Sequence, residues 1–201
     1  MNTPAISISP AFRDVPREAQ AVFRTVVEAM AHPGRIFPLI AGFAPPRPLT
    51  LGAAAIMLTL ADFETPVWLD RVLSENPAVR EFLRFHTGAR FAADPVDASF
   101  ALIGDPAGAP PLDVFAQGTA EYPDRSATVI FQVETLSPDG WQLEGPGIRK
   151  RGQFSAAPLR TDFLAQLTEN RKRFPLGVDL IFAASDAIAA VPRSTRLVGA
   201  F

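Results

Sequence analysis

The segment that most constrains the fold is the apolar run from Leu51 to Ala61, which follows Thr50 and ends at Asp62. As a helix it would be apolar on nearly every side, and such a helix is buried on most sides within a larger core. We therefore predict a helix that begins at Thr50 as its N-cap, runs to Asp62 and lies in the middle of the fold. The run is shorter than the roughly 20 residues that cross a bilayer.

Three further helices are predicted from capping residues and apolar spacing. Asp14 is a suitable N-cap for a helix that ends at Pro33-Gly34. The pair Asn76-Pro77 begins a second helix, which ends near Gly88. Residues 158–170 carry apolar side chains at helical spacing and predict the third.

Short β-branched and apolar runs between these helices predict a mixed sheet. The segment Ser137-Pro-Asp-Gly140 has the composition of a hairpin turn, and we expect it to join strands 127–133 and 141–144. Residues 1–13 predict an extended arm, and the remainder a single α/β domain within residues 1–201. Strands are expected at residues 35–40, 65–69, 99–103, 127–133, 141–144, 178–183 and 188–191.

Composition excludes several kinds of chemistry. The 201 residues contain no cysteine and two histidines, which excludes disulfides, thiolate metal sites and iron–sulfur ligation. We predict no metal site. The net charge of −2 argues against a broad electrostatic contact with nucleic acid, and we predict no nucleic-acid partner. The start of the chain lacks the basic and apolar regions of a signal peptide, so we expect a soluble, cytoplasmic protein without a membrane partner.

Several polar residues lie at the ends of apolar segments, where ligand pockets form in α/β folds. Candidate ligand-binding residues are Asp62, Arg84, His86, Arg193 and Thr195. Four of them have a structural alternative: Asp62 can bond the turn at Thr65, Arg84 and His86 suit a helix C-terminus, and Arg193 can pair with Asp179, which can also cap a turn. We expect at least three of Asp62, Arg84, His86 and Arg193 to line one cleft. No residue is assigned a catalytic role.

A second candidate is the turn Gly145-Pro-Gly147 beside the basic run Arg149-Lys150-Arg151. Turn amides can form a concave site for an oxyanion or phosphate. A hairpin reversal beside a solvated charge run is the alternative.

Taken together, these segments resemble the PhnH family of the bacterial carbon–phosphorus lyase system. The matching segments follow one another from about residue 12 to residue 196. They are Phe23-Arg24 to Ala29-Met30 with Pro33-Gly34, Leu58-Thr-Leu-Ala-Asp62, Thr65-Pro-Val-Trp-Leu69, Leu83-Arg-Phe-His-Thr87, Gly118-Thr119, Gly145-Pro-Gly-Ile148, Phe174-Pro-Leu-Gly-Val-Asp-Leu-Ile181 and Pro192-Arg-Ser-Thr195.

The resemblance implies a fold like that of pyridoxal-phosphate-dependent transferases, without the cofactor. It also implies a subunit that joins PhnG, PhnI and PhnJ in a core complex. That complex converts an alkylphosphonate and a nucleoside triphosphate into a ribosyl phosphonate triphosphate. The predicted role is that of an accessory subunit, because no catalytic residue carries over.

The sequence leaves two rival functions open. A pyridoxal-phosphate enzyme would need a Schiff-base lysine in an apolar pocket, and Lys150 and Lys172, the two lysines present, both lie in charged runs. A stand-alone phosphate- or nucleotide-binding regulatory domain is the other.

We also predict a homodimer in isolation. The aromatic segments Val67-Trp-Leu69, Phe82–Phe85 and Phe91 are apolar enough for an interface, and their alternative is core packing.

Overall fold

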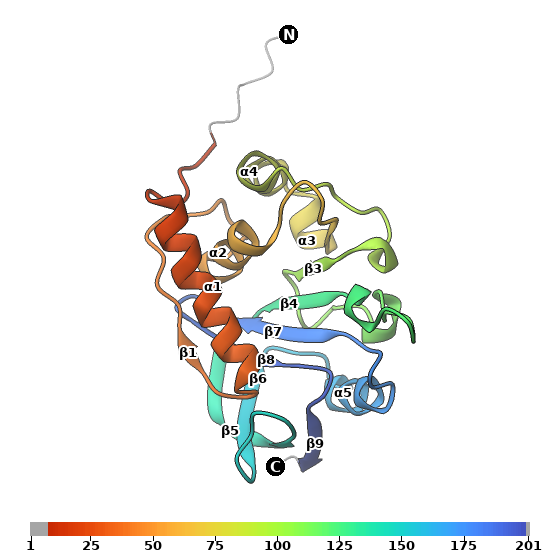
Figure 1. Cartoon of the computed structure of the whole chain (residues 1–201). Coiled ribbons are helices and arrows are strands. Elements are labelled where there is room, and N and C mark those ends of the chain that lie inside the picture. The colour runs from red at the N-terminus through yellow and green to blue at the C-terminus, as the bar shows by residue number, and fades with distance from the viewer. Residues whose placement is uncertain (1–7, 200–201) are drawn as a thin grey trace.

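A six-stranded mixed sheet, in the order β1-β8-β7-β4-β3-β2, forms the centre of the computed structural model, which describes residues 8–199 (Figure 1). Strands β2, β3, β4 and β7 are parallel, and β8 runs antiparallel to β7 and β1. A second, antiparallel sheet has the order β6-β5-β9. The predicted α/β class with a mixed sheet is confirmed.

The helices are α1 (Val15–Ala31), α2 (Leu51–Leu60), α3 (Arg71–Ser74), α4 (Pro77–Thr87) and α5 (Phe163–Lys172), and the 3₁₀ turns are η1 (Pro95–Asp97), η2 (Leu112–Val114) and η3 (Pro123–Arg125). The strands are β1 (Phe37–Pro38), β2 (Val67–Leu69), β3 (Phe100–Ile103), β4 (Thr128–Gln132), β5 (Thr135–Glu144), β6 (Gly152–Ala157), β7 (Asp179–Ala183), β8 (Ala187–Val191) and β9 (Arg196–Gly199).

Both faces of the central sheet are covered by apolar layers. Successive side chains of a strand point to opposite faces. Leu102, Ile130 and Ile181 therefore pack in one core with α1, α2 and α4. Their neighbours in the strands pack in a second core with α5 and the smaller sheet. Burial on both faces is typical of parallel strands and explains why these strands are nearly continuous apolar runs.

Helix α2 lies where its composition predicts. Residues Ala53 to Ile56 have no exposed surface, and the helix contacts α1, α4 and β4. Thr50 precedes the helix, but its hydroxyl does not cap it. Instead, the backbone N–H and the hydroxyl of Thr50 both donate to Oε1 of Gln132, at 2.8 and 3.2 Å. This links the start of α2 to the end of β4.

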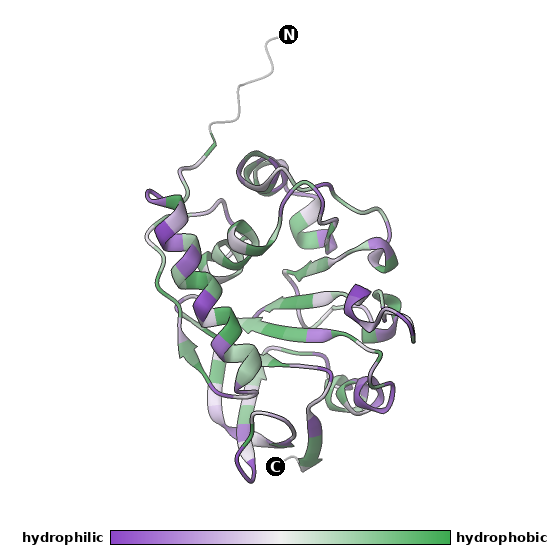
Figure 2. Cartoon of the chain, in the orientation of Figure 1, coloured by the Kyte–Doolittle hydropathy of each residue, from purple (hydrophilic) through white to green (hydrophobic). Residues whose placement is uncertain are grey.

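The predicted caps of α1 and α4 are confirmed. Asp14 accepts a hydrogen bond from the backbone N–H of Arg17, and Asn76 accepts from those of Ala78 and Val79. Gly88 ends α4 with a φ of 71°, a conformation that favours glycine. Hydrophilic residues of α1 face outward in Figure 2, as its amphipathic sequence requires.

The predicted hairpin at residues 137–140 is wrong. Strand β5 continues through these residues, with a register shift between Ser137 and Trp141, and pairs with β6 and β9. Strand β4 pairs instead with β3 and β7. Pro and Gly occur at strand irregularities as well as in turns, and only the pairing with neighbouring strands distinguishes the two.

Other boundaries also differ from those predicted. Helix α5 begins at Phe163 rather than Pro158, and the strand expected over residues 35–40 is reduced to β1. Helix α3 and strands β6 and β9 were not predicted. Each is short or has no marked apolar period, so pairing and packing with distant residues determine them.

The arm predicted over residues 1–13 lies partly outside the described residues, which exclude 1–7. Residues 8–13 form no helix or strand, and the ring of Phe12 packs edge-on against Phe43 with centroids 5.3 Å apart.

The aromatic segments considered for an interface lie mainly in the core. Val67, Leu69, Phe82 and Leu83 are buried, and half-buried Trp68 packs against a neighbouring Phe ring. Core packing explains these residues, and of the apolar side chains in these segments only Phe85 is strongly exposed, at 66 %.

No helix within residues 8–199 combines the length and apolarity needed to span a bilayer.

Candidate functional site

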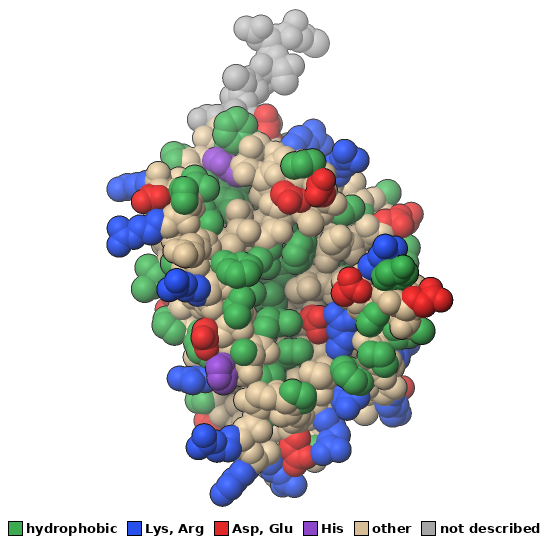
Figure 3. Space-filling model, viewed as in Figure 1, with side chains coloured by type: hydrophobic (Ala, Val, Ile, Leu, Met, Phe, Trp, Pro, Cys, Tyr) green, Lys and Arg blue, Asp and Glu red, His purple; other side chains and the backbone are tan. Residues whose placement is uncertain are grey.

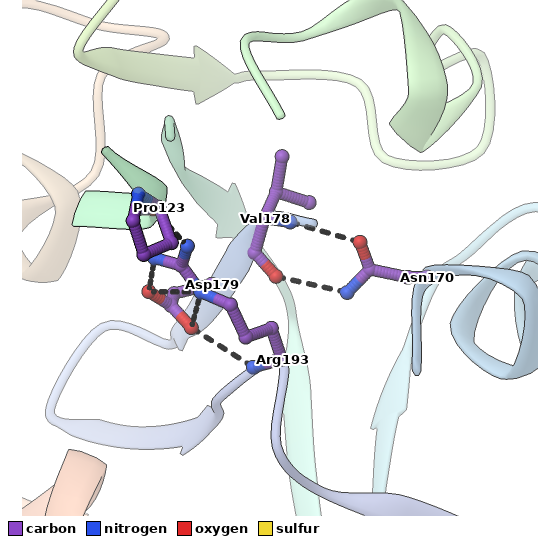
Figure 4. A network of polar contacts seen from close by, with 5 residues as sticks. All are labelled: Pro123, Asn170, Val178, Asp179 and Arg193. Carbon is purple, nitrogen blue, oxygen red and sulfur yellow. Dashed lines mark hydrogen bonds and ion pairs between the residues drawn. The ribbon is translucent and has the colours of Figure 1, made fainter. Parts of the chain in front are cut away.

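The charged site with the most hydrogen bonds surrounds Arg193, just after β8. Its guanidinium pairs with both carboxylate oxygens of Asp179, the first residue of β7, and also donates to the carbonyl of Pro123 in η3 (Figure 4). The backbone N–H of Arg193 donates to the same carboxylate at 2.8 Å. Both side chains are 15 % exposed. The predicted pair is confirmed, and it joins three separate segments at the amino-terminal edge of the parallel strands.

A neutral contact fixes the residue before Asp179. The side-chain amide of Asn170 in α5 accepts from the backbone N–H of Val178 at 2.8 Å and donates to its carbonyl at 2.9 Å (Figure 4). Asn170 is buried, so these two bonds satisfy backbone groups that have no strand neighbour at that point. The start of β7 is therefore bound at Val178 by Asn170 and at Asp179 by Arg193.

An open pocket of about 510 Å³ lies against the Asp179–Arg193 pair. Its lining is mainly apolar, with Phe174 and several prolines, and Asp124 adds a carboxylate. Thr195 lies two residues beyond Arg193 but is 1 % exposed, and its hydroxyl has no hydrogen-bond partner among residues 8–199. The pocket contains Arg193 but not Thr195.

Asp62, Arg84 and His86 lie elsewhere. Asp62 accepts hydrogen bonds from the backbone N–H groups of Glu64 and Thr65, so it closes a local turn. Nε2 of His86 lies 3.0 Å from the carbonyl oxygen of Ser9.

Arg84 is exposed on α4, with its guanidinium 5.6 Å from the ring centroid of Phe91, and it lines a different pocket that includes neither Asp62 nor His86.

The expectation that three of these four side chains line one cleft is therefore wrong. Arg193 follows β8, whereas Phe91, beneath Arg84, bridges to β2. Strands β8 and β2 are four positions apart in the sheet, roughly 19 Å at a spacing of about 4.8 Å. Polar residues at the ends of apolar segments gather only when those segments end at the same edge of neighbouring strands.

Asp70, the most buried acidic residue, is not among the residues predicted from the sequence. Its carboxylate accepts from the backbone N–H groups of Leu73, Gly104 and Asp105, at 2.8–3.2 Å. Burial raises the pKa of Asp70, and these three hydrogen bonds partly oppose that shift. The side chain caps α3 and fixes the loop after β3. An aspartate directly after a strand is the signal that could have identified it.

The basic run lies on a groove of its own. The groove has a volume of about 530 Å³ and lies between the 145–153 segment and the chain that links α1 to β1. Its lining includes Arg35, Arg149 and Arg151, with His32 at one end. The turn predicted at residues 145–148 is present, closed by the N–H of Ile148 donating to the carbonyl of Gly145 at 3.1 Å.

The fold and this site define a class: a small α/β domain in which the charged groups of Asp179 and Arg193 bind each other and backbone groups. Comparison with known proteins gives the particular family. Residues 10–198 match the family model described as bacterial phosphonate metabolism protein (PhnH), and the chain belongs to the PhnH family.

Two relatives match almost the whole chain. The chain is 41 % identical over 191 residues to the α-D-ribose 1-methylphosphonate 5-triphosphate synthase subunit PhnH of Rhizobium meliloti (strain 1021), covering 94 % of each protein. It is 28 % identical over 204 residues to the putative C-P lyase subunit protein HtxG of Stutzerimonas stutzeri, covering 98 % of this chain and 96 % of that protein.

Proposed function

We propose that this chain is the PhnH-type subunit of an α-D-ribose 1-methylphosphonate 5-triphosphate synthase, within a carbon–phosphorus lyase complex that breaks down phosphonates. The observation that carries the proposal is the match over nearly the full length of both proteins at 41 % identity. The alternative of a stand-alone regulatory domain gains no support, because both relatives are named as subunits.

Growth on a phosphonate tests this function. A bacterial strain lacking its own PhnH subunit is supplied with this chain and grown on methylphosphonate as the sole phosphorus source. We expect growth to be restored, with the empty vector as the negative control and growth on phosphate as the viability control. Soluble, folded protein that does not restore growth would contradict the proposal.

Within that complex we propose an accessory rather than a catalytic role. The Asp179–Arg193 pair supports this, because its charged groups are already bound to each other and to the backbone. The proposed partners are PhnG, PhnI and PhnJ, and the proposed compartment is the cytoplasm. A tagged pull-down from cells grown on methylphosphonate tests the partners, and recovery of this chain alone would contradict them.

We further propose self-association in isolation. Large apolar side chains are exposed on α1, with Phe23 at 50 % and Val27 at 48 %, one helical turn apart. Figure 3 shows hydrophobic side chains gathered in the middle of one face, with charged side chains around them. Sedimentation velocity of the isolated chain at micromolar concentration tests the homodimer.

The resemblance to the fold of pyridoxal-phosphate-dependent transferases, without the cofactor, remains a proposal based on the family. Lys150 and Lys172 are both exposed, and the latter pairs with Glu169 at 2.6 Å. A Schiff-base lysine needs an enclosed, apolar site. Borohydride reduction in the presence of the cofactor should therefore leave no stoichiometric adduct on either lysine.

The five candidate ligand-binding residues, Asp62, Arg84, His86, Arg193 and Thr195, also remain proposals. Their positions do not support one common site: Arg193 and Thr195 are close in sequence after β8, whereas Arg84 lines a different pocket that includes neither Asp62 nor His86.

A further inference from the structure

The groove lined by Arg35, Arg149 and Arg151 is the strongest unexplained feature of the surface. Every charged residue in its lining is basic, and no aspartate or glutamate is among them. The chain as a whole carries a net charge of −2. The concentration of positive charge is therefore local, and it is opposite in sign to the molecule's overall charge.

The acids that contact these residues leave much of this charge unpaired. Glu144 binds Nε of Arg151 at 2.9 Å and also pairs with Arg196. No ion pair is found for Arg35 or Arg149 within residues 8–199. The guanidinium of Arg35 lies 5.0 Å from the centroid of the Phe37 ring, which orients it without neutralising it.

The backbone of the groove is held rigidly. Gly147 has a φ of 80°, and a Cβ there would lie 2.0 Å from the carbonyl oxygen of Ala31 at the end of α1. At Gly34, with a φ of 77°, a Cβ would lie 2.9 Å from Cδ1 of Leu143 and 3.2 Å from Cβ of Phe154. These contacts fix the basic segment against α1 and β5, so the groove exists before any ligand arrives.

Backbone donors add to the side-chain charge. In the part of the chain that the structure describes, the N–H groups of Gly147, Arg149 and Lys150 donate to no backbone carbonyl outside regular elements. Lys150 has a φ of 71°, so the chain turns sharply at this point. Successive N–H groups in such turns form anion-binding concavities.

From these observations we propose that the groove binds the oligophosphate chain of a phosphorylated ligand. Guanidinium groups bind phosphate oxygens in a bidentate manner. A volume of about 530 Å³ suits a small molecule. Two or three linked phosphates match three arginines better than one phosphate does. The inference rests on the proposed function in one respect only: a synthase that makes a 5-triphosphate handles a ligand with an oligophosphate chain.

Isothermal titration calorimetry on the full chain tests the proposal, with inorganic tripolyphosphate and ATP as probes. The test variant is Arg35→Gln with Arg149→Gln, since neither side chain is in an ion pair needed for folding. The matched control is Arg71→Gln with Arg80→Gln, which removes two exposed arginines on α3 and α4. Circular dichroism establishes that both variants are folded.

We expect the wild-type chain and the control to bind both probes alike, and the groove variant to bind at least tenfold more weakly. An equal loss of probe affinity in the groove variant and the control would show general charge attraction and overturn the proposal. An equal loss of probe affinity in sodium sulfate at matched ionic strength would likewise show general charge attraction and overturn the proposal. So would tighter binding of an acidic peptide or an oligonucleotide at the same groove, or no binding of either probe at millimolar concentration. Restored growth without probe binding would refute the groove alone; binding without growth would refute only the proposed function.

Discussion

Replacing Asp179 with alanine should destabilise the protein strongly, because its carboxylate holds two kinds of donor. The backbone N–H of Arg193 would lose its acceptor, at a cost of about 1 kcal/mol. The guanidinium would lose a bidentate partner, at about 2–3 kcal/mol, below the range for fully buried pairs because both side chains are 15 % exposed.

The expected loss in the free energy of unfolding is therefore about 3–4 kcal/mol. For a chain of this size that corresponds to a decrease in Tm of roughly 6–16 °C. Urea denaturation followed by circular dichroism measures the loss, provided the slope m is unchanged.

A double-mutant cycle with Asp179→Ala and Arg193→Ala isolates the pair, with an expected coupling of about 2 kcal/mol. The control is Lys172→Ala, which breaks the exposed pair with Glu169 and should change stability by less than about 0.5 kcal/mol. A coupling below about 0.5 kcal/mol would refute the reasoning that this network holds η3, β7 and β8 together.

Three further outcomes are expected. Gly147→Ala should lower the free energy of unfolding by more than about 2 kcal/mol, because its Cβ would meet the last carbonyl of α1 and its φ is 80°. Gly42→Ala, with open space around it, is the control, and equal stability of the two variants would contradict the clash. The hydrogen bond from Arg160 lowers the pKa of Asp162 to about 2. The stabilising contribution of the Asp162 carboxylate is therefore complete above the ordinary pKa of 3.8 and disappears as the pH falls towards 2. Carboxyl NMR titration should show a higher pKa for Asp162 in Arg160→Gln, and an unchanged pKa would contradict the assigned cause. Trp68→Arg should lower the Tm by several degrees, because the ring packs in the core; lost self-association at unchanged Tm, by sedimentation, would indicate an interface instead.

Features that depend on a few neighbouring residues were predictable from the sequence. The caps at Asp14 and Asn76 and the stop at Gly88 work within one helical turn, so local chemistry determines them. The burial of α2 follows from its composition, because no orientation of that helix gives water a polar face. The Asp179–Arg193 pair was foreseen as one alternative, from two opposite charges at the ends of apolar strands.

Features that depend on which segments become neighbours were decided by the tertiary structure. Strand β5 continues through a turn-like sequence because β6 and β9 supply its partners. Asp70 is buried because the loop after β3 passes over it. The basic groove joins Arg35 to Arg149, more than 100 residues later in the chain. The order of strands in the sheet also places Arg84 and Arg193 apart, since local sequence cannot specify which edges of which strands adjoin.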